Sequence, residues 1–157
     1  MPRRDTSAKR EAAKAAAGAR THLAPFRAVP DLLAGMGVPS EPILRSARIT
    51  RADLEDPERN APFDRVDRLL GGCVARSGCE HFGLLIGQTV DLRSLGIPGR
   101  LALSAPTAGD ALSALGRHFV LHDSGGSPRV AVNDGTAILS YGIHVPGVRN
   151  ADQVYDL

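Results

Sequence analysis

The stretch TAGDALSALGRHFVLHDSGGSPRVAVNDGTAILSY, residues 107–141, decides the class of fold, because its apolar pattern changes period partway along. At its start, Thr107 and Asp110 have the spacing of a capping box, with Asp in place of the usual Glu. We therefore expect a helix that runs to about Val120. The side chains it should bury are Ala111, Leu112, Leu115 and Phe119.

The second part of this stretch has the pattern of a β-hairpin. Two apolar runs flank Asn133-Asp134-Gly135, and Asp-Gly supplies the positive φ angles that a tight turn needs. We predict a hairpin over Arg129–Val145, with residues 119–123 as a third antiparallel strand. The expected fold class is therefore α+β, with several helices packed on a small antiparallel β-sheet.

The clearest helix of the chain is predicted from Phe63 to Arg76, and Gly78 can supply its left-handed C-terminal residue. On this pattern Asp64 and Asp67 face away from the core. The residues at helical spacing that should face the core are Phe63, Val66, Leu70, Cys73, Val74 and Ser77.

Shorter elements are predicted on both sides of this helix. Pro30 and Pro42 each suit the first turn of a short helix, and residues 81–90 have helical spacing. Residues 50–62 are polar and suggest a connector with about one turn. Residues 95–106 are rich in Gly and Pro and suggest a loop with a short strand or turn, while residues 151–157 resemble the first turns of a helix.

Charge divides the chain into an arm and a body. The net charge is +2, from 19 basic and 17 acidic residues. Residues 1–20 hold six of the basic and two of the acidic side chains, so the rest of the chain is slightly acidic. We predict a disordered, basic, Ala-rich arm over residues 1–25 and one domain over residues 26–157. Such an arm can contact DNA weakly and without sequence preference.

Composition narrows the class of protein. Hydrophobic residues make up 43% and charged residues 23%, a globular balance, and the absence of Trp implies an aliphatic core. No apolar run reaches the roughly 18 residues of a membrane span, and the N-terminus lacks the apolar stretch of a secretory signal. Two Cys are too few for a disulfide framework. We expect a cytoplasmic protein with no membrane partner.

Few residues suggest catalysis or metal binding. His118 and His122 are four apart, a metal-ligand spacing, but His144 and Asp123 are the nearby candidates to complete a site and fit no known pattern. Cys73 is most simply a small core residue. No Gly-x-Ser-x-Gly elbow or phosphate-binding loop occurs. We expect no catalytic residues, no metal and no cofactor.

The order of several weak motifs resembles one known family. A short helix ends in Gly37-Val38, and FGLLIG follows at residues 82–87. Ser104, Pro106 and Thr107 then precede Ala111-Leu112 at a helix start. The helix ends in Arg117-His118, and PGVRNADQVYD closes the pattern at residues 146–156. From about residue 29 to 157, the chain resembles the N-terminal, arabinose-binding-like sensor domain of AraC/XylS-type transcription regulators, a bacterial type of regulator.

This resemblance implies a domain that binds a small effector in a largely apolar pocket and controls dimerisation or a DNA-binding domain. The candidate polar contacts to the effector are Arg100, Arg117, His118, His122 and Tyr141. Self-association, either as a homo-oligomer or with a full-length regulator, is expected through apolar residues near the hairpin and the C-terminus. These are Ile138, Leu139, Ile143, Val154 and Leu157.

The regulators that the chain resembles continue into two helix-turn-helix units, and we find no such recognition helix in this sequence. DNA contact, apart from that of the basic arm, is therefore expected only through a domain absent from the chain. We interpret the chain as a truncated regulator, a fragment or the ordered part of a longer protein, with a sensor domain incomplete at its C-terminus. The alternatives are an interaction module that dimerises with a full-length relative, and a nonfunctional remnant.

Overall fold

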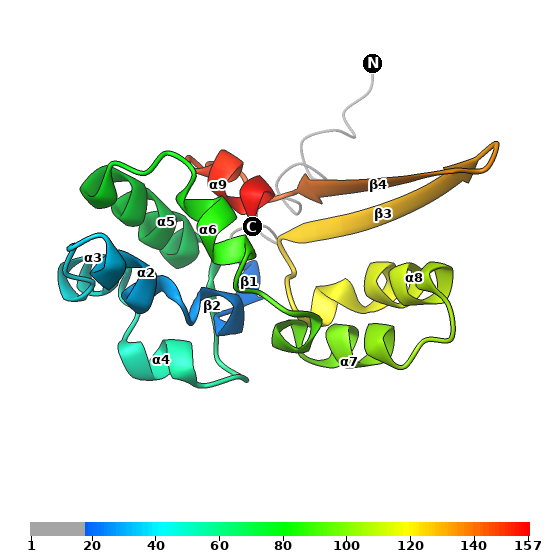
Figure 1. Cartoon of the computed structure of the whole chain (residues 1–157), viewed down its shortest axis with the longest axis horizontal. Coiled ribbons are helices and arrows are strands. Elements are labelled where there is room, and N and C mark those ends of the chain that lie inside the picture. The colour runs from blue at the N-terminus through cyan, green and yellow to red at the C-terminus, as the bar shows by residue number, and fades with distance from the viewer. Residues whose placement is uncertain (1–17) are drawn as a thin grey trace, which may run out of the picture.

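The computed structural model describes residues 18–157 and contains two groups of elements (Figure 1). We call residues 19–87 the helical half and residues 92–143 the hairpin half. The helical half comprises β1 (Arg20–His22), η1 (Ala24–Phe26), α2 (Val29–Gly35), α3 (Glu41–Ala47), α4 (Arg51–Glu55), β2 (Asn60–Pro62), α5 (Phe63–Ser77) and α6 (Phe82–Gly87). The hairpin half comprises η2 (Leu92–Leu95), α7 (Ile97–Leu103), α8 (Ala108–His118), η3 (Phe119–Leu121), β3 (Gly126–Asn133) and β4 (Thr136–Ile143). Helix α9 (Ala151–Asp156) returns to the helical half.

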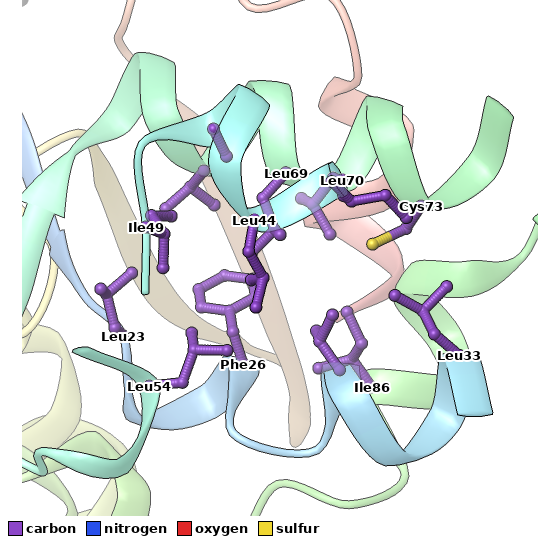
Figure 2. Close-up of a cluster of buried hydrophobic side chains, with 14 of the residues drawn as sticks. Leu23, Phe26, Leu33, Leu44, Ile49, Leu54, Leu69, Leu70, Cys73 and Ile86 are labelled. Atoms are coloured by element: carbon purple, nitrogen blue, oxygen red, sulfur yellow. The ribbon is translucent and has the colours of Figure 1, made fainter. Parts of the chain in front are cut away.

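The core of the helical half is built around α5, as its apolar spacing predicts. Phe63, Val66, Leu70 and Cys73 are all buried. The helix ends at Gly78, whose φ of 70° lets its backbone N–H reach the carbonyl of Val74. Side chains from η1, α2, α3, α4 and α6 converge on this stripe and form one continuous hydrophobic cluster (Figure 2).

The predicted short helices are confirmed at α2 and α3. Pro30 and Pro42 occupy the first turns, where a missing N–H costs no hydrogen bond. Helix α6 covers only Phe82–Gly87 of the predicted residues 81–90. Close packing explains its glycines, because a Cβ at Gly83 would overlap the backbone of Gln153 on α9. Helices α6 and α9 can therefore lie in direct contact.

The prediction of a loop and short strand for residues 95–106 is wrong, since Ile97–Leu103 forms helix α7. Pro98 lies in the first turn of α7, a position that tolerates Pro, and Gly96 precedes the helix at φ 66°. A side chain at Gly99 would overlap the backbone of Leu92. The Gly and Pro that suggested a loop therefore start a helix and pack it against η2.

Ordered structure begins before the predicted start of the domain. Residues 1–17 of the expected arm lie outside the described residues. The remaining arm residues belong to the fold, because Arg20–His22 pairs with Asn60–Pro62 and Leu23 is buried. The strand β2 was missed within the predicted connector 50–62, since three residues are too few to show a strand period.

The hairpin is confirmed and extends as a long arm beside α8 (Figure 1). Asp134 and Gly135 form the turn with φ angles of 49° and 79°. The third strand predicted for residues 119–123 is wrong, because Phe119–Leu121 forms the 3₁₀ helix η3. A single bridge between Thr21 and Asp123 is the β contact of this segment within residues 18–157.

Helix α8 begins as predicted but does not bury its apolar face. The Thr107 hydroxyl accepts the N–H of Asp110 at 3.1 Å, the first half of the expected capping box. None of the α8 side chains is fully buried. The four residues predicted to be buried are instead half-buried: Ala111, Leu112, Leu115 and Phe119. The helix packs on α7 and β3, which are themselves thinly covered.

Asp67 on α5 was predicted to face away from the core and is instead buried. Its Oδ1 accepts the backbone N–H groups of Arg149 and Asn150, at 3.1 and 2.9 Å. The Asn150 side chain also donates to the carbonyl of Asp67 at 2.9 Å. The predicted C-terminal helix is confirmed as α9, and Asp67 holds its start against α5.

Candidate functional site

A cavity of about 230 Å³ lies where the helical half, the hairpin half and α9 meet. Its walls come from segments far apart in the sequence, and most of the lining is apolar. The lining residues are Thr21, Pro25, Phe26, Phe63, Val66, Val90, Leu95, Phe119, His122, Asp123, Tyr141, Val154, Tyr155 and Leu157.

Aromatic side chains are concentrated at this cavity. The chain has four Phe, two Tyr and no Trp, and five of these six rings line the cavity, all except Phe82. Phe119 meets Tyr141 edge to face with ring centroids 5.8 Å apart, and Tyr141 meets Tyr155 in the same way at 6.2 Å. Because the chain has so few aromatic residues, the presence of five rings in one lining distinguishes this cavity from the rest of the molecule.

His122 lies in the cavity wall and is only 6% exposed. Its ring stacks on His22 at 5.4 Å, and its buried Nδ1 has no hydrogen-bond partner among the described residues. Burial lowers the pKa of His122 to about 4, and the neighbouring charge of His22 contributes to this lowering. The imidazole is therefore neutral near pH 7, with a polar atom left unsatisfied.

Asp123 follows His122 and is also buried. Its Oδ1 accepts the N–H of Gly125 at 2.6 Å, and its Oδ2 accepts the hydroxyl of Tyr141 at 3.3 Å. Burial raises the pKa of Asp123, while these hydrogen bonds partly offset that rise. Burial also raises the pKa of Tyr141, and the Asp123 carboxylate adds to the rise, so the phenol stays protonated and donates.

Gly126 lets Tyr141 reach Asp123. A Cβ at Gly126 would overlap the Tyr141 hydroxyl, so only glycine leaves room for the ring at this point. The turn Ser124-Gly125-Gly126, which the sequence shows only as flexible, therefore shapes the polar side of the cavity.

The structure brings together two of the five predicted ligand contacts. His122 and Tyr141 line the cavity, whereas Arg100, Arg117 and His118 do not. Arg100 and Arg117 are exposed, and Arg117 donates to the carbonyl of Ser113 within its own helix. Helix α8 ends at His118, so His118 and His122 do not share a helical face.

The remaining candidates for chemistry are isolated. Among residues 18–157, no three His, Cys, Asp or Glu side chains are grouped to hold a metal ion. Cys73 and Cys79 are both free thiols. Burial raises the pKa of the Cys73 thiol to about 12, which suits the core role expected for it.

The five residues expected at a self-association surface occupy two different environments. Ile138 and Leu139 are 52% and 62% exposed, and as neighbours on β4 they point to opposite faces of the hairpin. Ile143 is half-buried near the base of the hairpin. Val154 and Leu157 pack against the core and line the cavity.

A larger groove of about 570 Å³ runs over α2, α4 and η2. Its charged side chains carry both signs and lie at the surface, as at Arg27, Asp31 and Glu55. Water can solvate these groups, and none of them is left buried without a partner. The smaller cavity, with its mostly apolar and aromatic lining, is therefore the stronger candidate for a specific site.

Sequence reasoning missed Thr21, Asp123 and four of the five aromatic rings as members of the site. Their local patterns mark them as strand, turn and core residues, and nothing in those patterns links them. The one signal in the sequence that could have pointed to these residues is the scarcity of aromatic rings, because five of the six rings line the same cavity.

The chain belongs to the family described as the arabinose-binding domain of AraC transcription regulators, N-terminal, whose family model matches residues 37–156. The resemblance seen in the sequence is thereby confirmed. This is a family of ligand-sensing, regulatory domains rather than of enzymes. No curated protein matches the chain. None of the helices in residues 18–157 combines the length and apolar character that crossing a bilayer requires.

Proposed function

We propose that the chain senses a small effector, which binds in the cavity between the two halves and α9. The observation that carries the proposal is a mostly apolar cavity whose wall includes His122, a residue whose buried Nδ1 has no hydrogen-bond partner among residues 18–157. Apolar pockets with a few convergent polar groups are typical of small-molecule sites. Asp123 and Tyr141 supply two further polar groups on the same side.

The arrangement of the walls supports a regulatory role for binding. Phe63 and Val66 come from α5, Tyr141 from β4, and Tyr155 from α9, so one ligand contacts three elements that are far apart in the sequence. A ligand that fits one arrangement of these elements better than another shifts the population toward it. We propose that the hairpin and α9 are the parts whose positions respond.

We further propose that this response controls dimerisation or a DNA-binding domain. The hairpin is the best candidate for the surface between two copies, because both of its strands have a free edge within the described residues. Val132 and Leu139 expose 68% and 62% of their surfaces there. A second copy can pair with the same patch around a two-fold axis. The two free thiols are consistent with a cytoplasmic protein.

Thermal melts against a panel of small organic metabolites test the proposal. An effector raises the melting temperature of the wild-type chain through preferential binding to the folded state. The variant Leu95→Trp, which fills the cavity from η2, should lose that response and remain folded. Compounds that stabilise both chains equally, or a panel without any stabilising compound, would contradict binding in this cavity.

A further inference from the structure

The cavity lining carries negative charge without a positively charged side chain to balance it. Asp123 supplies the single carboxylate side chain among the lining residues, and no Arg or Lys of residues 18–157 lines the cavity. None of the ion pairs found within residues 18–157 involves Asp123. His122 is neutral near pH 7 because its pKa is about 4, and it does not supply the missing positive charge. The carboxylate is thus placed in an apolar wall without a protein cation, and such a group is costly to bury unless something pairs with it.

The hydrogen bonds of Asp123 orient its carboxylate but leave its charge uncompensated. One oxygen accepts the N–H of Gly125 and the other accepts the hydroxyl of Tyr141. Burial raises the pKa of Asp123, and Thr21 and Gly126, as nearby donors, offset part of that rise. All four donors are neutral, so the negative charge of the ionised carboxylate stays available to a cation in the cavity.

Aromatic rings line the same cavity as Asp123. Tyr141 is nearly perpendicular to both Phe119 and Tyr155, at 78° and 83°, so the three rings present surfaces in different directions. The face of an aromatic ring is negative and attracts ammonium groups, most strongly where water is excluded. Two more rings, from η1 and α5, belong to the same wall.

From this juxtaposition we propose that the cavity selects a small organic cation, with an ammonium group beside Asp123 and an apolar body against the aromatic rings. The inference rests on the proposed function and names the chemical class of its effector. The volume of about 230 Å³ limits the ligand to less than drug size, since drug-sized ligands occupy pockets of roughly 300–1,000 Å³. A cavity of about 150 Å³ holds benzene, so one ring with a short ammonium-bearing chain fits.

Three probes of one skeleton and different charge test the inference: benzylammonium, benzyl alcohol and benzoate. Isothermal titration of the full chain at pH 7 gives a dissociation constant for each. We expect benzylammonium to bind at least about tenfold more tightly than benzyl alcohol, and benzoate to bind most weakly. Amide shifts in NMR spectra should map the binding to Thr21 and Tyr141 at the cavity.

Two variants test separately how much the carboxylate charge and the aromatic rings contribute to binding of the cation. Asp123→Asn keeps an acceptor for the N–H of Gly125 but removes the charge, so it should bring benzylammonium down to the affinity of benzyl alcohol. Phe119→Leu keeps an apolar wall and should reduce the preference for the cation by several-fold. Asp31→Asn is the matched control, because it removes an exposed carboxylate that lines the other groove and should change nothing.

The outcomes distinguish this inference from the function on which it rests. Tighter binding of benzyl alcohol or benzoate at the cavity would overturn the inference and leave effector sensing intact. An unchanged preference for the cation in both cavity variants would overturn it as well, and loss of the preference in Asp31→Asn would place the cation in the groove. If no probe binds at millimolar concentration, the inference fails, whereas effector sensing fails only if no compound of the metabolite panel stabilises the chain. Should Asp123→Asn fail to melt cooperatively, Phe119→Leu decides the question.

Discussion

The helical half and the hairpin half differ sharply in how they bury apolar surface, although their sequences are similarly aliphatic. Eighteen apolar residues are buried in the helical half, and Ala102 is the single one in the hairpin half. Two large apolar side chains are exposed in the first, Met36 and Leu84, against ten in the second. The helical half therefore contains a hydrophobic core of its own, whereas the hairpin half leaves many of its large apolar side chains exposed.

This difference indicates which half is free to respond to a ligand. Segments with few buried apolar contacts open and move at lower free energy than a packed core. The candidate cavity lies between the two halves, with one wall from the rigid α5 and another from β4 of the thinly packed hairpin. Under the proposed function, we expect a ligand there to shift the hairpin more than the packed core.

The largest expected effect compares one leucine from each half. Leu70→Ala removes a fully buried side chain from α5 and should lower the free energy of unfolding by about 2–5 kcal/mol. Leu139→Ala removes an exposed one from β4 and should change it by less than about 0.5 kcal/mol. Urea unfolding measures both. Equal losses would show that the hairpin is covered in solution, for example by a second copy.

Acid should weaken the contact between the two halves. The pKa of His122 falls from 6.5 to about 4 on burial, so the neutral ring is the form that the fold favours. The stability that depends on it is complete above pH 6.5 and is lost as the pH falls toward 4, by about 3 kcal/mol in all. Asp123 has a raised pKa and acts in the opposite direction.

Melts of the wild-type chain and of His122→Gln, recorded from pH 7 to pH 4, isolate this effect. The wild-type chain should lose more stability over that range, because the glutamine side chain of the variant cannot take up a proton. Parallel curves for the two chains would mean that His122 is solvated in solution and that the halves are not closed around it.

A smaller effect is expected where α9 is tied to the helical half. Asp67→Ala leaves the N–H groups of Arg149 and Asn150 without their acceptor, which should cost about 1–3 kcal/mol. Hydrogen exchange should quicken in α9 and at its partner Gly83, while α2 and α3 stay protected. Uniform acceleration throughout the chain would show that α9 is part of one cooperative unit with the core.

The smallest effect contrasts the two helix caps. Thr50 and Asp53 form a complete capping box at α4, whereas Thr107 at α8 forms half of one. Thr50→Ala and Thr107→Ala should each cost about 1 kcal/mol of local stability. The loss at Thr50 should appear in the global melt, because α4 packs on the core. The loss at Thr107 should appear mainly as faster exchange in α8, and an effect of Thr107→Ala on the global melt would argue against a separate hairpin half.

Local patterns predicted most of the elements. Helix α5 and its buried face follow from the spacing of Phe63, Val66 and Leu70, and the hairpin follows from Asp134-Gly135. The failures have local causes as well. Pro98 suggested a loop, although Pro is well tolerated in the first turn of a helix. The residues of η3 are apolar like those of a strand, but no neighbouring strand within residues 18–157 pairs with them.

Periods and motifs within short windows were enough to predict the family and the class of fold. They also placed two cavity-lining residues, His122 and Tyr141, among the five candidate ligand contacts. That Asp67 turns inward to hold α9, and that Asp123 lines one cavity with five aromatic rings, follows from the folded arrangement of the chain. The reason is physical: which wall of a cavity a residue joins depends on contacts between segments far apart along the chain, as between Thr21 and Asp123. No local preference of the chain encodes such a contact.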